Sequence, residues 1–195
     1  GCSFDFLAPL ACGAHITLLG RIPSPKILIE AMKTTRPNIV CSVPMILEKV
    51  YRKSILPMLE KGPMSIAMRI PLINTAIYST IRSKLMEQFG GCVEIFIVGG
   101  AALNKETEDF LRTIKFPITV GYGMTECAPL ISFQNPALFK SGSCGAILPP
   151  ELLEAKIMSR DPENIPGELL VRGEHVMMGY YKNEDATAAT FTEDG

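Results

Sequence analysis

The spacing of hydrophobic residues divides the chain into a first part that alternates helices with strands and a second part of consecutive short strands. Apolar residues recur at helical spacing along residues 73–89, and Gly90-Gly91 then supplies a C-terminal cap. Ser24-Pro25 marks the start of an earlier helix, with a hydroxyl cap and proline in the first turn. Three compact apolar runs have the length of buried strands: residues 38–43, 93–98 and 116–120. The pattern predicts an α/β fold.

Other segments of the first part are interpreted in the same way. Residues 15–19 read as a buried strand, on which His15 would be a hydrogen-bonded core histidine. Pro44 opens a helix, and Pro57, Pro63 and Pro71 would break any long helix over residues 53–72. The run 73–89 carries few cations, so a helix facing the core is expected rather than one lying on a membrane.

After residue 131 the sequence pattern changes, and turn-rich stretches separate short apolar runs. Strands are predicted at 154–158, 168–172 and 176–181, and a helix at 185–191. The prediction is therefore a layered α/β subdomain over residues 1–132, followed by part of a small β-barrel-like subdomain over 133–195.

Composition restricts the partners and the compartment. A net charge of −1 over 195 residues gives no electrostatic reason to bind nucleic acid. Six cysteines lie far apart without a Cys-x-x-Cys pair, which predicts reduced, mostly buried thiols in a cytoplasmic protein and no zinc site. Residues 6–20 are the longest weakly charged stretch, but proline and glycine interrupt it and it is shorter than the ~20 residues of a spanning helix. We expect buried strand and helix pieces there, and no signal peptide.

The stretch that carries chemistry is residues 121–131, which follows a predicted strand. Gly121 and Gly123 bracket Tyr122, so a flat ring stands between two positions where the backbone can approach a ligand closely. Thr125 and Glu126 then place a hydroxyl beside a carboxylate. A ring for stacking, a hydroxyl for a phosphate and a carboxylate for a divalent cation suit a nucleotide–metal complex. A tight turn that opens a helix is the competing interpretation. Cys127 adjoins the motif, and packing is its expected role.

A second candidate unit combines a strand, two glycines and a helix. Gly99-Gly100 follows the run 93–98, and Asn104 is placed to cap a helix that extends to Ile114. Parallel sheets present ligands at such junctions. Acidic residues in the first turns of this helix would repel a phosphate, so backbone contact with a flat base is the better expectation.

These residues resemble a known family. Residues 121–126 resemble the Gly-Tyr-Gly-x-Thr-Glu signature of the adenylate-forming (AMP-binding) enzymes, which include acyl-CoA synthetases, luciferases and peptide-synthetase adenylation domains. Residues 99–103 resemble the family's Gly-Gly-Ala-x-Leu segment, and residues 167–187 its Gly-Glu-Leu…Gly…Gly-Tyr…Thr segment. Asp185 departs from the usual Pro-Glu-Ala-Thr at a loop position. Residues 10–20, 36–43 and 44–57 are similar to the long-chain fatty acid branch.

The resemblance implies roles for individual residues. Glu126 would hold Mg²⁺ against the phosphates of ATP, and Thr125 would hydrogen-bond the α-phosphate. The nucleotide would also contact the remaining residues of the two glycine segments, with Tyr122 stacked on adenine: Gly99, Gly100, Ala101, Gly121, Tyr122, Gly123 and Met124. The implied activity is that of a fatty acid–CoA ligase, with ATP, Mg²⁺, coenzyme A and a fatty acid as its partners.

The same resemblance sets limits on the activity. The chain has no Ser/Thr/Gly-rich phosphate loop, no Thr-Gly-Asp ribose segment and no C-terminal lysine domain, so we expect it to be an excised piece that is inactive alone. Activation of an aryl or amino acid is the alternative, although residues 39–47 contain no acid to bind an ammonium group. A non-catalytic α/β interaction module is a further alternative. Oligomeric state, chain-length preference and peripheral membrane association stay open.

Overall fold

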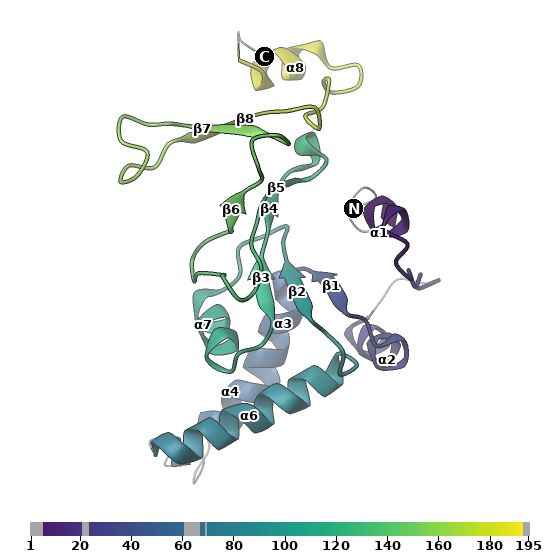
Figure 1. Cartoon of the computed structure of the whole chain (residues 1–195), viewed down its shortest axis with the longest axis vertical. Helices are drawn as coiled ribbons and strands as arrows, with labels where there is room; N and C mark the ends of the chain where they lie inside the picture. The colour runs from purple at the N-terminus through teal and green to yellow at the C-terminus, as the bar shows by residue number, and fades with distance from the viewer. Residues whose placement is uncertain (1–5, 21–23, 61–66, 69, 193–195) are drawn as a thin grey trace.

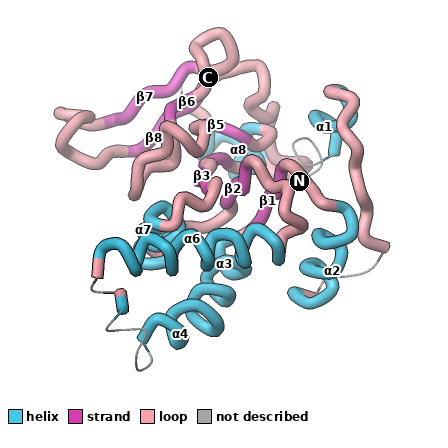
Figure 2. Tube along the Cα trace, turned by 60° about the horizontal axis from the view of Figure 1, so that its bottom comes forward, coloured by secondary structure: helices cyan, strands magenta, loops and turns pink. Residues whose placement is uncertain are grey.

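The computed structural model describes residues 6–20, 24–60, 67–68 and 70–192 of the chain. Its arrangement is elongated (Figure 1). Most helices lie at one end, a three-stranded sheet lies in the middle, and two smaller β structures with the last helix lie at the other end. Figure 2 shows the same separation of helices and strands from another side.

The central sheet is parallel, as the alternating pattern predicts. It consists of β1 (Ile39–Ser42), β2 (Ile95–Val98) and β3 (Ile118–Val120), in that order. Ser42 pairs with Val98, and Val98 with Val120, so the three strands end in one row. Every residue of β3 is buried, whereas Ile39 on the edge strand β1 is exposed. The carboxyl ends of all three strands therefore open onto the same edge of the sheet.

Two of the predicted helices form with the expected caps. Helix α2 (Pro25–Thr35) begins at Ser24, whose hydroxyl accepts a 3.3 Å hydrogen bond from the Ile27 amide. Helix α6 (Pro71–Gln88) ends at Gly90 and Gly91, which both have positive φ. A β-carbon on Gly90 would overlap the Met32 carbonyl of α2, so only glycine lets the two helix ends come together.

The expectation that Pro57 breaks a helix is wrong. Helix α3 (Pro44–Val50) continues through a π-helical turn, η2 (Tyr51–Ile55), into α4 (Leu56–Glu60), which contains Pro57. The Leu56 amide bonds to the carbonyl of Tyr51, one residue farther back than in an α-helix. The wider turn relieves the clash between a proline ring and the preceding turn. Pro71 stands in the first turn of α6, where proline is tolerated, and Pro63 lies outside the described residues.

The core lies between the parallel sheet and these helices. Phe89 at the end of α6 is fully buried, and its ring centroid lies 5.0 Å from that of Phe96 on β2. Phe116 completes the cluster at 5.7 Å from Phe96. Along α6 the residues of the predicted face become buried only towards the end, from the exposed Ile73 to the buried Ile81 and Leu85. The face prediction is confirmed for the second half of the helix.

The acidic first turns of α7 (Lys105–Thr113) bind other parts of the chain. Asn104 caps the helix by accepting from the Thr107 amide at 3.2 Å. The buried Glu108 accepts a 2.8 Å hydrogen bond from the Gly142 amide, and Asp109 accepts one of 2.6 Å from the Ser141 hydroxyl. These carboxylates therefore fasten the 141–142 turn to the helix.

The second part of the chain is β-rich, as expected. Strands β4 (Tyr122–Gly123), β5 (Leu130–Phe133) and β6 (Ala146–Ile147) form an antiparallel sheet, and β7 (Glu154–Met158) pairs with β8 (Glu168–Arg172). The strands at 154–158 and 168–172 and the final helix, α8 (Glu184–Thr190), are confirmed. The strand predicted at 176–181 is wrong: the Met177 and Tyr180 amides bond to the Glu126 carbonyl and the Thr187 hydroxyl, not to a strand.

Of the N-terminal predictions, a short helical piece is confirmed, and the strand and the burial are wrong. Residues 15–19 form no strand, because their backbone has no partner strand in the described structure. A four-residue helix, α1 (Ala8–Ala11), precedes them and lies to one side of the sheet (Figure 1). His15 is exposed rather than buried, as are Leu10 and Leu18.

The cysteines are also more exposed than the sequence predicts. Cys12, Cys41 and Cys144 are exposed, Cys92 is half-buried and Cys127 is buried. The sequence predicts mostly buried thiols, but three of the five described cysteines lie at the surface, and Cys2 lies outside the described residues.

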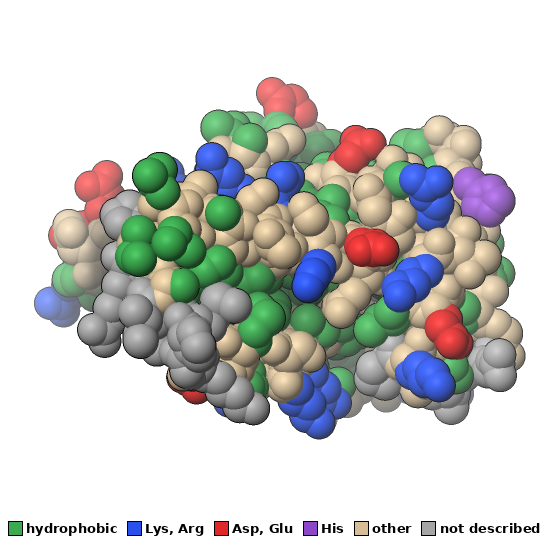
Figure 3. All heavy atoms as spheres, turned by 90° about the horizontal axis from the view of Figure 1, so that it is seen from below, with side chains coloured by type: hydrophobic (Ala, Val, Ile, Leu, Met, Phe, Trp, Pro, Cys, Tyr) green, Lys and Arg blue, Asp and Glu red, His purple; other side chains and the backbone are tan. Residues whose placement is uncertain are grey.

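The face formed by the helical end has no single type of charge. Lys and Arg side chains stand dispersed among acidic and hydrophobic ones (Figure 3). Hydrophobic side chains gather toward one end of this face, and the start of α6 exposes Ile70, Leu72 and Ile73. Across the described ranges, no helix combines the length and the hydropathy needed to cross a bilayer.

Candidate active site

The two glycine motifs meet at the carboxyl ends of the parallel strands. The Gly99 amide donates to the Ser42 carbonyl at 3.1 Å, and the Gly121 amide donates to the Val98 carbonyl at 2.9 Å. A β-carbon on Gly99 would stand 3.4 Å from the carbonyl oxygen of Gly121. The motifs are 22 positions apart in sequence but share one corner of the sheet edge, where open α/β sheets bind ligands.

Gly123 lets the motif fold back on itself. It pairs with Leu130 across a register shift in the β4–β5 ladder, and the Met124 amide donates to the Pro129 carbonyl at 2.8 Å. A β-carbon on Gly123 would overlap that carbonyl, so the turn needs glycine. Tyr122 on β4 is 39% exposed, which leaves its ring accessible to a ligand.

Thr125, Glu126 and Cys127 form a single 3₁₀ turn, η3. The tight turn predicted from sequence is present, but it does not continue into a longer helix. Thr125 is exposed, and within the described part of the chain its hydroxyl has no hydrogen-bond partner. Cys127 points the other way: it is buried against Ile131 and Leu153, and burial raises the pKa of its thiol. The structure thus supports a packing role for Cys127.

Glu126 is held by a segment far along the chain. The hydroxyl of Tyr180 donates a 2.7 Å hydrogen bond to Oε1 of Glu126, and the Met177 amide donates at 2.7 Å to the Glu126 carbonyl. The bond from Tyr180, aided by a bond from the backbone amide of Glu126 itself, lowers the pKa of the Glu126 carboxyl. The same bond raises the pKa of the Tyr180 phenol. At neutral pH the carboxylate is therefore ionised and fixed in direction.

A cleft of about 520 Å³ lies beside this turn. Its walls come from four places in the chain: the motif itself, the β7–β8 hairpin, the segment at Val176 and Met177, and the end of α8. Glu126 and Met124 line it on the motif side, and Lys156 and Arg172 bring positive charge from the hairpin. Arg172 is engaged by Glu154, whose carboxylate it contacts at 2.6 Å.

The donor set fits a magnesium ion that is shared with phosphates. Among the described residues, Tyr180 is the one side chain that donates a hydrogen bond to Glu126, and it bonds to Oε1, so no described side chain blocks the approach of a cation to Oε2. In the described part of the chain no three His, Cys, Asp or Glu side chains converge as a complete metal site. One carboxylate is what Mg²⁺ commonly takes from a protein when substrate phosphates and water supply the other oxygens.

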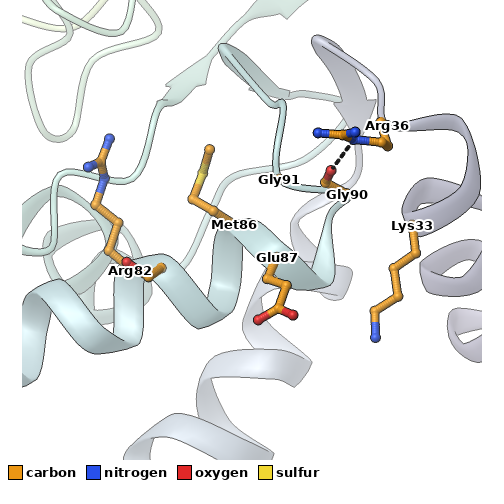
Figure 4. Close-up of a pocket in the computed structure, with 8 residues that line it drawn as sticks. Lys33, Arg36, Arg82, Met86, Glu87, Gly90 and Gly91 are labelled. Atoms are coloured by element: carbon orange, nitrogen blue, oxygen red, sulfur yellow. Dashed lines mark hydrogen bonds between the residues drawn. The ribbon is translucent and has the colours of Figure 1, made fainter.

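A second hollow, between α2 and the end of α6, is excluded as the active site by its place in the fold (Figure 4). It lies at the amino-terminal edge of the sheet, where helices turn into strands. Arg36 Nε donates to the Gly90 carbonyl at 3.4 Å, and Arg82 Nε to the Lys115 carbonyl at 2.9 Å. These two arginines satisfy carbonyl groups of the helix-to-strand turns, which is a structural role.

The structure brings some of the predicted site residues together and leaves others apart. Gly99 and Gly121 adjoin, and Tyr122 to Glu126 follow without a break on β4 and η3. Gly100 has a positive φ and open space around it, and Ala101 is exposed on the loop that precedes α7. Sequence reasoning assigned no role to Tyr180, because no spacing rule connects residue 180 with residue 126. The adjoining Gly179 was a signal, since it marks a special backbone at that point.

Comparison with known proteins gives this arrangement a family. The profile of the AMP-binding enzymes matches residues 1–181, which include both glycine motifs, Thr125, Glu126 and Tyr180. The chain belongs to the AMP-binding enzyme family.

Individual relatives support the assignment. A 4-coumarate–CoA ligase from Pinus taeda is 32% identical over 163 residues, an alignment that covers 77% of this chain and 30% of the relative. O-succinylbenzoate coenzyme A synthetase from Bacillus subtilis, solved with AMP, superimposes with a TM-score of 0.66 at 20% identity, over 96% of this chain and 33% of that structure. A long-chain-fatty-acid–CoA ligase from Archaeoglobus fulgidus gives a TM-score of 0.62 at 17% identity, over 96% of this chain and 35% of that structure. The α/β fold, a fragment of the adenylate-forming fold, is thus confirmed. The chain spans about a third of the length of these proteins.

Proposed function

We propose that this chain carries part of the active site of an ATP-dependent acid–CoA ligase, which activates a carboxylic acid as an acyl-adenylate and then transfers it to coenzyme A. The observation that carries the proposal is the η3 turn. It places the ionised Glu126 carboxylate, whose Oε2 bonds to no described side chain, next to the Thr125 hydroxyl, which has no hydrogen-bond partner among the described residues. Membership of the AMP-binding family makes ATP the nucleotide to expect.

Each motif residue would have a separate task in adenylation. Mg²⁺, when bound, would neutralise charge on the phosphates of ATP. Glu126 would hold this ion, and the Thr125 hydroxyl would donate to an α-phosphate oxygen. Tyr122 would offer its exposed ring to adenine, and the backbone of 99–101 would lie along the base. Gly121 and Gly123 would leave room for the acid. The reaction needs such positioning and charge neutralisation more than it needs a covalent nucleophile.

For the acid we propose a long-chain fatty acid. The junction between β1 and α3 exposes apolar side chains, with Val43 48% and Met45 54% accessible, at the same edge as Gly99 and Gly121. Residues 39–47 contain no carboxylate that could pair with the ammonium group of an amino acid. An apolar acid therefore suits this edge better than a zwitterion.

An aryl acid is the second candidate. Relatives with 30–34% identity include 4-coumarate–CoA ligases, and coumarate also presents an apolar body behind its carboxylate. Both candidates need the same motif residues, so they differ only in the pocket for the acid.

ATP–pyrophosphate exchange by the longer protein that contains this chain separates the candidates. The panel would include fatty acids of increasing length, hydroxycinnamates and amino acids. Exchange that rises with chain length supports the fatty acid, and exchange confined to hydroxycinnamates supports the aryl acid. If no acid supports exchange in a folded protein, the ligase proposal fails and the non-catalytic interaction module becomes the better account.

The isolated 195-residue chain is expected to form no acyl-CoA, because it spans only about a third of the length of the relatives that it matches. Formation of a thioester by the chain alone would contradict this expectation.

A further inference from the structure

Tyr180 lies on a segment that is bound to the η3 turn at two points. Besides the 2.7 Å bond from its hydroxyl to Oε1 of Glu126, the Met177 amide donates to the Glu126 carbonyl at 2.7 Å. One contact fixes the backbone of residue 126 and the other fixes its side chain. Residues 177–180 therefore restrict Glu126 in both position and direction.

The segment is itself anchored by α8. The Tyr180 amide donates to Oγ1 of Thr187 at 2.9 Å, and that hydroxyl donates to the Asn183 carbonyl at 2.8 Å. Asn183 caps α8 by accepting from the Ala186 amide at 3.1 Å. A rigid helix start thus sets the position of the Tyr180 backbone.

Gly179 makes this anchorage possible. Its φ is +148°, and a β-carbon on it would stand 2.8 Å from the Thr187 methyl group. Any larger residue would push Thr187 away from the Tyr180 amide. The glycine, the tyrosine and the threonine of this stretch therefore serve one geometrical purpose.

We propose that Tyr180 is a positioning residue for the cation-binding carboxylate: it occupies Oε1 of Glu126 and thereby presents Oε2 to the metal–phosphate complex. The inference rests on the proposed function for the metal, and on the structure for the contact. A ligating carboxylate that is hydrogen-bonded on its second oxygen holds its metal in one geometry, and loss of such a partner typically costs 10–100-fold in affinity or activity. Tyr180 itself touches neither the cation nor the nucleotide.

The test uses Tyr180→Phe, which removes only the hydroxyl, with Tyr181→Phe as the matched control. Tyr181 is 88% exposed, and its ring centroid lies 5.2 Å from Nζ of Lys182. In the longer protein, Tyr180→Phe is expected to weaken binding of MnATP by about 10-fold or more, measured by calorimetry without an acid substrate. It is also expected to lower kcat for exchange and raise the Mg²⁺ concentration required, with the KM for the acid unchanged. Tyr181→Phe should change none of these values.

A second variant, Thr187→Val, keeps the shape of residue 187 but removes the acceptor for the Tyr180 amide. It should weaken MnATP binding in the same direction and by less. An unchanged metal requirement in Tyr180→Phe, with thermal unfolding equal to that of the wild type, would overturn the proposal. So would an equal loss in Tyr181→Phe.

Failure of this inference is distinguishable from failure of the proposed function. The carboxyl ¹³C signal of Glu126 in the folded, glutamate-labelled longer protein reports the hydrogen bond without any nucleotide, and Glu126→Gln identifies the signal. A signal that moves in Tyr180→Phe but not in Tyr181→Phe confirms the contact even if the longer protein shows no exchange. A signal that stays in place refutes the contact even if exchange is normal.

Discussion

Gly123 and Pro129 face each other so closely that a β-carbon on Gly123 would overlap the Pro129 carbonyl. That carbonyl accepts from the Met124 amide at 2.8 Å, so it cannot turn aside without loss of the bond that closes the motif. The prediction is that Gly123→Ala destabilises the chain by about 1–3 kcal/mol, the usual cost of overpacking. It should also abolish exchange in the longer protein, since Thr125 and Glu126 follow directly. Chemical denaturation and exchange measure the two effects.

Gly20→Ala is the control for that change, because a β-carbon on Gly20 meets nothing within 4 Å. Stability equal to wild type in both variants would contradict the close approach.

Phe89 is expected to contribute more to stability than any exposed residue of α6. It is fully buried and contacts the rings of Phe96 and Phe116 at centroid distances of 5.0 and 6.0 Å. Phe89→Ala should lower the free energy of unfolding by about 3–5 kcal/mol, through lost transfer energy and a cavity. Leu72→Ala, at a side chain 86% exposed, should stay within about 0.5 kcal/mol of wild type. Similar losses in both variants would place the core elsewhere.

The cap of α7 gives a smaller, local effect. Asn104 Oδ1 accepts a hydrogen bond from the Thr107 backbone amide at 3.2 Å. The backbone amide of Asn104 separately donates to Oε1 of Glu48 at 2.9 Å. Asn104→Ala removes the first bond and keeps the second. The expected loss is about 1 kcal/mol in the free energy of unfolding, measured with a denaturant. Asn104→Asp should recover most of it, because aspartate also caps helices. If Asn104→Asp does not recover the free energy of unfolding, the side-chain amide group of Asn104 has another role.

Tyr51 should make stability fall at high pH. Burial, and then a 3.1 Å hydrogen bond to Glu106, raise the pKa of its phenol to about 12. In the unfolded chain the phenol ionises near its ordinary value of 10.0, while the folded chain keeps the proton up to about 12. The contribution of Tyr51 is therefore complete below pH 10 and is lost as the pH rises towards 12.

Tyr51→Phe removes this titration, so the loss of stability from pH 9 to pH 11.5 should be smaller in the variant. Denaturant unfolding at the two pH values measures the difference. An identical pH dependence in both proteins would show that Tyr51 ionises as an exposed phenol.

Much of the fold could be predicted from sequence because local signals carried it. Ser24 and Asn104 predict the starts of helices, and the apolar runs that end at Val98 and Val120 predict buried parallel strands. The failures concern segments whose structure depends on distant partners. Residues 176–181 are mostly apolar, as in a buried strand, but the Met177 and Tyr180 amides bond to Glu126 and Thr187. Residues 15–19 have no neighbouring strand, among the residues that the structure describes, to complete a ladder.

The candidate site was likewise predictable where it depends on local sequence and not where it depends on distant contacts. The order of Gly121 to Glu126 was sufficient to expect a nucleotide–metal site, since contiguous residues carry it. The adjacency of Gly99 to Gly121 followed from parallel strands that end at one edge. The bond between Glu126 and Tyr180 could not be predicted, because it depends on how the segment after β8 returns to the motif.

The central claim is that Glu126 serves nucleotide chemistry through a bound cation. It is tested most directly by ATP–pyrophosphate exchange in the longer protein that carries Glu126→Gln, with Glu163→Gln on an exposed turn as the control. The account predicts that Glu126→Gln lowers exchange by about 100-fold or more while the protein stays folded, since a positioned charge in the transition state is lost. Glu163→Gln should match wild type. Wild-type exchange in a folded Glu126→Gln protein would contradict the account.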